Sequence, residues 1–207
     1  DWVAGPREEI NRINVFPVPD GDTGPNFSLT LRSVADALRA LGDASLPDTV
    51  QAMSRGAVLG ARGNSGMMLA HFLLGFAEHS GQRTALSTIE LAECLRSGAA
   101  HLEASLDEPR EGTLLTVARE AAAAALRAAR TTDDVLTFMR RTLAEGEASL
   151  ARTPELLAVL REAGVVDAGA KGFILMVEGV VRMMEGNPIL PAAPCGGDGM
   201  DFAPAAH

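Results

Sequence analysis

Two aspartates with the spacing of a divalent-cation site lie in a proline- and glycine-rich segment, Asn14-Val-Phe-Pro-Val-Pro-Asp-Gly-Asp-Thr-Gly24. Its prolines exclude a continuous helix because they fix φ and lack a backbone donor. In an extended or turn-like loop, the carboxylates of Asp20 and Asp22 can face one point. Two hard oxygen ligands on a stiff loop suit Mg²⁺ that also binds phosphates. Asp-Gly-Asp is also an ordinary solvated turn. Three apolar residues favour instead a loop packed against a core: Val15, Phe16 and Val18.

A second glycine-rich segment, Gly60-Ala-Arg-Gly-Asn-Ser-Gly66, has the composition of a phosphate-binding loop. Its glycines permit close backbone approach, and Asn64 and Ser65 supply side-chain donors. The helix that follows would present free N–H groups and a partial positive charge at its N-terminus. The segment lacks the ending of a Walker loop, and no strand precedes it as in a Rossmann loop. Alone it would be a plain turn between helices, but beside the aspartate loop phosphate binding is the better interpretation.

Other polar residues near glycines have more than one interpretation. Arg62 pairs with a phosphate or with a structural carboxylate. Thr113, which follows Gly112, contacts a phosphate or caps the next helix, and the cap is favoured. Asp167 caps the last helix, accepts a hydrogen bond from a ribose hydroxyl, or assists a metal. The histidines share no ligand spacing and are predicted to be surface or core residues, and the Met67-Met68 pair is predicted to be core. These histidines are His71, His79, His101 and His207.

Apolar residues at helical spacing predict helices along nearly the whole chain. Ser45 with Asp48 and Ser87 with Glu90 are helix start signals. No run of alternating β-branched residues predicts a strand. The sequence therefore predicts an all-α fold of roughly eight antiparallel helices, arranged as a bundle or helical barrel. The expected helices cover residues 1–13, 26–41, 45–59, 67–76, 87–106, 113–129, 131–151, 153–164 and 173–184. Residues 1–186 are expected to form the domain, and the Pro/Gly-rich residues 187–207 a linker or tail.

Composition narrows the class of protein. The 207 residues are 47% hydrophobic and 22% charged, which fits one globular domain. A net charge of −9 argues against nucleic acid or an anionic membrane surface as a partner. Cys94 and Cys195 have no CxxC partner, so we expect neither structural zinc nor a disulfide framework. A cytoplasmic location is expected for the same reason. We find no signal peptide and no run apolar enough to span a bilayer. Because the chain begins without Met, we expect it to be part of a longer protein.

Four segments resemble, in order and spacing, those of the nucleotide-binding domain of the dihydroxyacetone-kinase L-subunit superfamily. They are the aspartate segment, the glycine-rich segment, Glu111-Gly-Thr113 and Val166-Asp-Ala-Gly169. The resemblance covers roughly residues 1–186 and is strongest to the N-terminal kinase domain of bacterial fatty acid kinase. It implies an eight-helix antiparallel barrel that holds ATP and Mg²⁺ at one end.

The resemblance also implies the roles of individual residues. Where the dihydroxyacetone-kinase branch has three metal-binding aspartates, this chain has Asp20, Asp22 and, as the remaining oxygen ligand, Asn14. Thr23 stands where that branch has His, which favours the fatty-acid-kinase branch. That branch usually reads Ser-Gln where this chain has Ala70-His71. The residues expected to bind the nucleotide are Thr23, Asn26, Gly63, Asn64, Ser65, Gly66, Thr113, Asp167 and Gly169.

The function expected from this resemblance is an ATP-dependent, Mg²⁺-dependent phosphotransferase in which Asp20 and Asp22 are catalytic. Its acceptor would be a fatty acyl carboxylate presented by a DegV-type fatty-acid-binding protein, fused or separate. One alternative is a glycerone (dihydroxyacetone) kinase that acts on a small ketose. Another is a non-catalytic nucleotide-binding domain that regulates a DegV-type lipid-binding protein. The oligomeric state stays open, with a homodimer as one arrangement.

Overall fold

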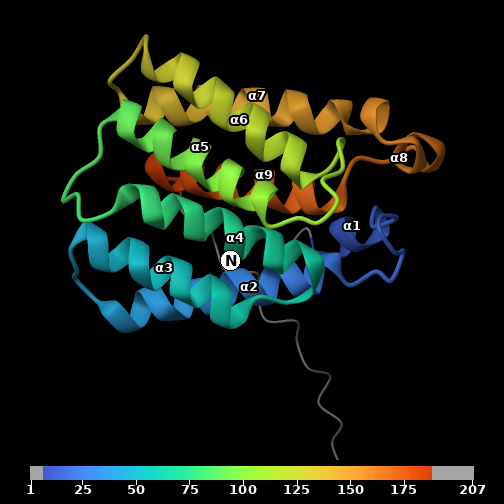
Figure 1. Cartoon of the computed structure of the whole chain (residues 1–207), viewed down its shortest axis with the longest axis horizontal. Helices are drawn as coiled ribbons and strands as arrows, with labels where there is room; N and C mark the ends of the chain where they lie inside the picture. Colours follow the sequence, from blue (N-terminus) through green and yellow to red (C-terminus); the bar gives the residue numbers. More distant parts are fainter. Residues whose placement is uncertain (1–6, 188–207) are drawn as a thin grey trace, which may run out of the picture.

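Helices form almost all of the structure, a computed structural model that describes residues 7–187 (Figure 1). No strand occurs within that range, so the all-α prediction is confirmed. The N-terminal residues 1–6 and the expected tail from residue 188 onward, with Cys195 and His207, lie outside the described residues. The helices are α1 (Arg7–Arg12), α2 (Thr23–Leu41), α3 (Leu46–Gly60), α4 (Gly63–Ser80), α5 (Thr88–Ala104), α6 (Leu114–Ala129), α7 (Val135–Leu156), α8 (Ala158–Ala163) and α9 (Ala168–Met184).

The long helices run alternately up and down, and each from α2 to α7 packs against the next. Helix α9 packs against α7, α6 and α2, so it closes the bundle. The short helices α1 and α8 lie at the end where α2, α4, α6 and α9 begin, on the right in Figure 1. This alternation places four helix N-termini at one end of the bundle.

Local capping signals begin several helices where the sequence predicts. The Ser45 hydroxyl accepts a hydrogen bond from the Asp48 N–H at 3.3 Å. Ser87 and Glu90 form a reciprocal capping box, with the Ser87 N–H donating to the Glu90 carboxylate at 2.8 Å. In the segment 131–134, Asp134 is the capping residue and accepts from the Thr137 N–H at 2.8 Å. Each cap pairs an N–H that the first turn of a helix leaves without a partner.

The expected helix start at Thr153-Pro154 is wrong, because α7 continues through both residues to Leu156. A proline inside a helix leaves the carbonyl four residues earlier without its N–H donor. Here that carbonyl belongs to Leu150, and the buried Thr153 hydroxyl donates to it at 2.8 Å. The threonine thus supplies the hydrogen bond that Pro154 cannot, and the next helix begins only at Ala158.

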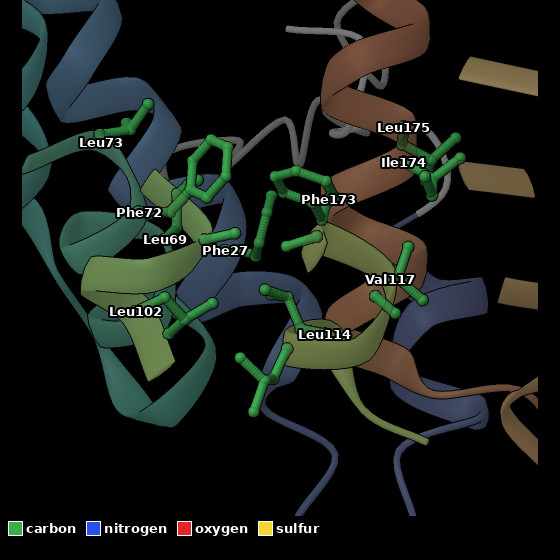
Figure 2. Close-up of a cluster of buried hydrophobic side chains, with 14 of the residues drawn as sticks. Phe27, Leu69, Phe72, Leu73, Leu102, Leu114, Val117, Phe173, Ile174 and Leu175 are labelled. Carbon is green, nitrogen blue, oxygen red and sulfur yellow. The ribbon is translucent and has the colours of Figure 1, made fainter. Parts of the chain in front are cut away.

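The core between the helices is filled by large apolar side chains (Figure 2). The Phe72 and Phe173 rings pack edge to face with their centroids 5.0 Å apart. Phe27 is fully buried, and a Cβ on Gly172 would come within 3.1 Å of its ring, so this glycine lets α9 pack closely on α2. In the described residues, none of the helices is long and apolar enough to cross a membrane.

Helices α4 and α5 pack closely at two glycines, Gly75 and Gly98. A Cβ on Gly98 would lie 2.7 Å from the Phe72 carbonyl oxygen, an atom that cannot move away without separating the helices. We therefore expect Gly98→Ala to destabilise the protein by about 1–3 kcal/mol in urea unfolding. In an ordinary helix interior, alanine is more stable than glycine by about 1 kcal/mol. The control is the exposed Ala100→Gly on the same helix, which should lose about that amount of stability. A Gly98→Ala protein as stable as the wild type would contradict the close packing.

Candidate functional site

Two glycines, Gly63 and Gly169, lie where the N-termini of α2, α4, α6 and α9 come together. A Cβ on Gly63 of α4 would lie 2.4 Å from the side-chain nitrogen of Asn26 on α2. A Cβ on Gly169 of α9 would lie 3.5 Å from the Ser65 hydroxyl on α4 and 3.7 Å from the Leu114 Cβ on α6. Because helix dipoles place partial positive charge at N-termini, this convergence favours the binding of an anion.

The first turn of α4 has free donors. Gly63, Asn64 and Ser65 form this turn, so the predicted glycine loop is in fact a helix start. No side chain caps it, and within the described residues the N–H groups of these three residues make no hydrogen bond. Arg62 precedes them, exposed, with its guanidinium donating to the Ala61 carbonyl at 2.8 Å rather than pairing with a carboxylate of the described chain. Free N–H groups at an exposed helix start are the usual donors to phosphate.

A cavity of about 600 Å³ opens at this end of the bundle. Its volume falls in the range of small-molecule sites. Five of the residues predicted to bind a nucleotide line it: Asn64, Ser65, Thr113, Asp167 and Gly169. The others do not line it, although Asn26 and Gly63 contact each other beside it. The expected residues outside the cavity lining are Asn14, Asp20, Asp22, Thr23, Asn26, Gly63 and Gly66.

Sequence reasoning missed most of the cavity wall. The apolar part is formed by side chains from five separate segments, and the polar part missed by that reasoning by His71, Ser105, Glu108 and Arg110. The prediction that Met67 belongs to the core is wrong, since it is 49% exposed and faces the cavity. Two methionines directly after a glycine-rich turn were the available signal. The apolar wall consists of Phe16, Pro17, Met67, Met68, Leu106, Leu114 and Leu157.

The aspartate loop between α1 and α2 borders the cavity, because Phe16 and Pro17 of this loop line it. Asp20 and Asp22 are exposed. Val18 is also 58% exposed, so the expected packing of the apolar loop residues against the core is wrong for Val18. Short-range loop geometry, rather than burial of every apolar side chain, therefore holds the carboxylates in place.

Asn14 anchors this loop. Its side chain is buried, and its amide nitrogen donates to an Asp20 carboxylate oxygen at 2.8 Å. Desolvation raises the pKa of Asp20, but hydrogen bonds with Asp22 and from Asn14 outweigh it and leave that pKa below its ordinary value. The Asn14 side-chain oxygen is buried and has no partner. The two carboxylates and an unpaired amide oxygen therefore fit a divalent cation that takes its remaining ligands from water and phosphate.

The described residues hold no cluster of three or more His, Cys, Asp or Glu side chains suited to a metal. The aspartate loop supplies two such side chains, Asp20 and Asp22, and both are exposed. The aspartate loop suits instead an ion that arrives with a phosphorylated ligand, as Mg²⁺ does.

Asp167 joins three helices. It caps α9, which is one of its three interpretations from the sequence, by accepting from the Ala170 N–H at 2.7 Å, and its own N–H donates to the Thr153 hydroxyl of α7 at 3.1 Å. The carboxylate also accepts from the backbone N–H groups of Gly169 and Leu114. The favoured cap at Thr113 is wrong, because the Thr113 hydroxyl donates to the Arg110 carbonyl at 2.7 Å. Asp167 therefore supplies the acceptor at the start of α6 as well as α9.

Asp167→Asn should change how stability depends on pH. Burial raises the pKa of Asp167 from 3.8 to about 6, although its bonds from backbone N–H groups act in the opposite direction. The folded protein thus holds this proton more tightly than the unfolded chain. The contribution of Asp167 to the free energy of unfolding is therefore largest below about pH 4 and falls by up to about 3 kcal/mol as the pH rises past 6.

In Asp167→Asn this fall should disappear, so the variant gains stability relative to the wild type between pH 4 and pH 7. Urea unfolding across this range measures the difference, and the exposed Asp43→Asn serves as the control. Wild-type and Asp167→Asn curves that run parallel with pH would contradict the raised pKa.

Together, the helical bundle and this end of it define a class of protein: an all-α domain with a cavity at the starts of its helices and an adjoining acidic loop. The chain belongs to the DAK2 domain family, whose model matches residues 17–182. This family comprises DhaL-like, kinase-related nucleotide-binding domains, which confirms the resemblance to the dihydroxyacetone-kinase L-subunit superfamily at that level.

Relatives with similar sequences are found in two bacteria, Staphylococcus haemolyticus and Bacillus subtilis. The chain is 40% identical over 180 residues to an uncharacterized protein of Staphylococcus haemolyticus, covering 87% of this chain and 33% of that protein. It is 39% identical over 180 residues to protein YloV of Bacillus subtilis, covering 87% of this chain and 32% of YloV. The chain thus spans about a third of the length of these relatives.

Proposed function

We propose that this domain binds ATP with Mg²⁺ and transfers the γ-phosphate to a fatty acyl carboxylate presented by a partner. The observation that carries the proposal is the uncapped first turn of α4. Its three free N–H groups adjoin the cavity that Asn64 and Ser65 line, near the Asp20–Asp22 loop. A triphosphate placed there meets backbone donors on one side and, through a cation, carboxylates on the other. DhaL-like members of the DAK2 family bind ATP or ADP, which supports this choice of ligand.

The aspartate loop would hold the cation. Asp20 and Asp22 supply carboxylate oxygens, and Asn14 fixes Asp20 while offering its own unpaired oxygen. When bound there, Mg²⁺ would supply positive charge that neutralises the phosphates of the nucleotide. The loop therefore contributes the two carboxylates, and the hydrogen bond from Asn14 orients that of Asp20 and helps to lower its pKa.

The remaining work of catalysis in this proposal is positioning. Phosphoryl transfer needs little covalent participation by protein groups, so no nucleophilic side chain is required. The N–H groups of Gly63, Asn64 and Ser65 would stabilise negative charge on the phosphates, and the apolar wall would exclude water from the nucleoside. Asp167 would act indirectly, because it orients the starts of α6 and α9 that line the cavity.

The proposed acceptor is a fatty acyl carboxylate, and a partner protein or domain would carry it. Thr23 in the aspartate loop favours a fatty-acid-kinase relationship over a ketose kinase. The described core is filled by its own side chains, so an acyl chain is better held elsewhere. A DegV-type fatty-acid-binding protein or domain would present the carboxylate at the mouth of the cavity.

Two measurements test the proposal in order. Calorimetry should detect ATP binding to this chain with Mg²⁺ and much weaker binding with EDTA. Transfer from γ-³²P-labelled ATP should then be measured with a fatty-acid-loaded DegV-type protein and, separately, with dihydroxyacetone. Label on the acyl group supports the proposal, whereas label on dihydroxyacetone replaces the acceptor with a small ketose. Mg²⁺-dependent binding without transfer to either would favour a regulatory nucleotide-binding domain.

A further inference from the structure

His71 occupies a position in the cavity wall that its expected role as a filler residue does not explain. It lies on α4, two turns beyond Asn64 and therefore about 10 Å along the helix axis. Met67 and Met68 lie between them and line the same cavity. The distance from the first turn of α4 to His71 is comparable to that from the phosphates of an extended nucleoside triphosphate to its base.

The His71 ring is held in a fixed orientation by His101 of α5. The two rings stack with centroids 5.5 Å apart and an angle of 28° between their planes. His101 comes this close because α4 has a glycine at position 75, where a Cβ would lie 2.4 Å from the His101 Cβ. The His101 ring also contacts α4 at a second place, because its Nε2 lies 3.9 Å from a carboxylate oxygen of Glu78.

Only one ring nitrogen of His71 is available to a ligand. Its Nδ1 is buried and has no hydrogen-bond partner. The same is true of the Nδ1 of His101. Burial and then the nearby charge of His101 lower the pKa of His71, so the ring is neutral near pH 7. A neutral ring with its proton on Nε2 leaves no unpaired N–H inside the protein. The Nε2–H is then a donor without a partner in the described residues.

Other polar side chains in this part of the wall already have partners. The Ser105 hydroxyl donates to the Leu102 carbonyl at 2.7 Å. Arg110 and Glu108 pair with each other at 2.6 Å. His71 therefore offers an unpaired donor in the same cavity as an apolar surface formed by Met67, Met68 and Leu106. An apolar slot with one free donor suits a flat heteroaromatic ring that has a nitrogen acceptor at its edge.

We propose that His71 is a base-recognition residue, whose Nε2–H donates to a ring nitrogen of a purine that packs against Met67, Met68 and Leu106. His101 is a positioning residue that holds the His71 ring. The inference rests on the proposed function, because the phosphates of the same nucleotide would lie at the start of α4. A donor at this place favours the purine edge of adenine, whose N1 accepts, over that of guanine, whose N1 carries a proton.

The test separates the base from the phosphates by comparing two ligands, ATP and inorganic tripolyphosphate, each with Mg²⁺. Calorimetry is performed on the wild type and on His71→Ala, His71→Gln and His101→Ala. We expect His71→Ala to weaken ATP binding about three- to tenfold, the usual effect of losing one hydrogen bond to a neutral group, and to leave tripolyphosphate binding unchanged. His71→Gln keeps a donor and should recover part of the loss. His79→Ala, on the same helix but outside the cavity lining, is the matched control.

The outcomes distinguish the two proposals. If wild-type protein binds neither ligand, the proposed function fails. If wild-type protein binds ATP and His71→Ala binds it equally well, only the assignment of His71 fails. A parallel loss of ATP and tripolyphosphate binding in His71→Ala would also overturn the assignment, because it would mean that the substitution disturbs α4. Thermal unfolding of each variant identifies that case independently, and a folded His71→Gln still tests the donor.

Discussion

Replacing Asp20 and Asp22 together with asparagine should abolish Mg²⁺-dependent ATP binding while leaving the helical bundle intact. Both carboxylates are exposed, so their loss removes charge without opening the core. Asparagine retains an oxygen that can accept the Asn14 hydrogen bond, which preserves the loop. Without the two negative charges the loop no longer attracts a divalent cation, and phosphoryl transfer should fall by at least about a thousandfold. Calorimetry with and without Mg²⁺, and transfer from labelled ATP, measure the two effects.

A matched control separates this effect from a general change in charge. Asp43→Asn removes an exposed carboxylate from the loop between α2 and α3 and should leave ATP binding unchanged. The free energy of unfolding of both proteins should stay within about 0.5 kcal/mol of the wild type, as is usual for surface substitutions. Wild-type affinity for ATP with Mg²⁺ in the double variant would exclude the aspartate loop as the cation site.

Gly63→Ala is expected to destabilise the protein by about 2–4 kcal/mol and to eliminate ATP binding. Two costs combine at this residue. Its φ of +56° is unfavourable for any residue with a Cβ. That Cβ would also lie 2.4 Å from the Asn26 side-chain nitrogen. The Asn26 side chain must shift to relieve the contact, and relief of the positive φ requires rotation of the first turn of α4, which turns its free N–H groups away from the cavity. Urea unfolding and calorimetry measure the two losses.

Gly81→Ala isolates the two costs from each other. Gly81 ends the same helix with nearly the same φ, +59°, but a Cβ there meets only open space and ordinary contacts. It should cost about 1 kcal/mol and leave ATP binding unchanged. The difference between the two variants then measures the crowding against Asn26. Equal destabilisation by both would show that the contact between α2 and α4 at Gly63 is of no consequence.

The starts of α3, α5 and α6 could be predicted to within one residue, whereas the expected starts at residues 26, 67, 131, 153 and 173 lie three to five residues from those of α2, α4, α7, α8 and α9. The boxes at Ser45 and Ser87 form as expected because each joins groups three residues apart in one chain segment. The same is true of Asp20 and Asp22, whose proximity depends on a single intervening glycine. Periodic apolar residues likewise determine the all-α class, since each amphipathic helix must bury one face.

Predictions failed where a partner came from a distant segment. At Thr113 the local cap is replaced by Asp167, which lies more than fifty residues later in the chain. At Pro154 a buried threonine hydroxyl pairs the carbonyl that the proline leaves free, so the helix does not stop. Met67 has the apolar character of a core residue, yet it faces the cavity because no other helix covers it there.

The sequence by itself therefore determined the all-α class, the caps at Ser45 and Ser87, and the two segments that we predict to hold a metal and a phosphate. Only the tertiary structure decided that the starts of α2, α4, α6 and α9 meet at one end, and that Asp167 rather than Thr113 serves the start of α6. It also decided that His71 and His101, thirty residues apart, stack beside the cavity. The physical reason is the separation in sequence between the residues that interact. Caps and helical turns join residues three or four positions apart, whereas the cavity joins residues from Phe16 to Gly169 through close packing at glycines.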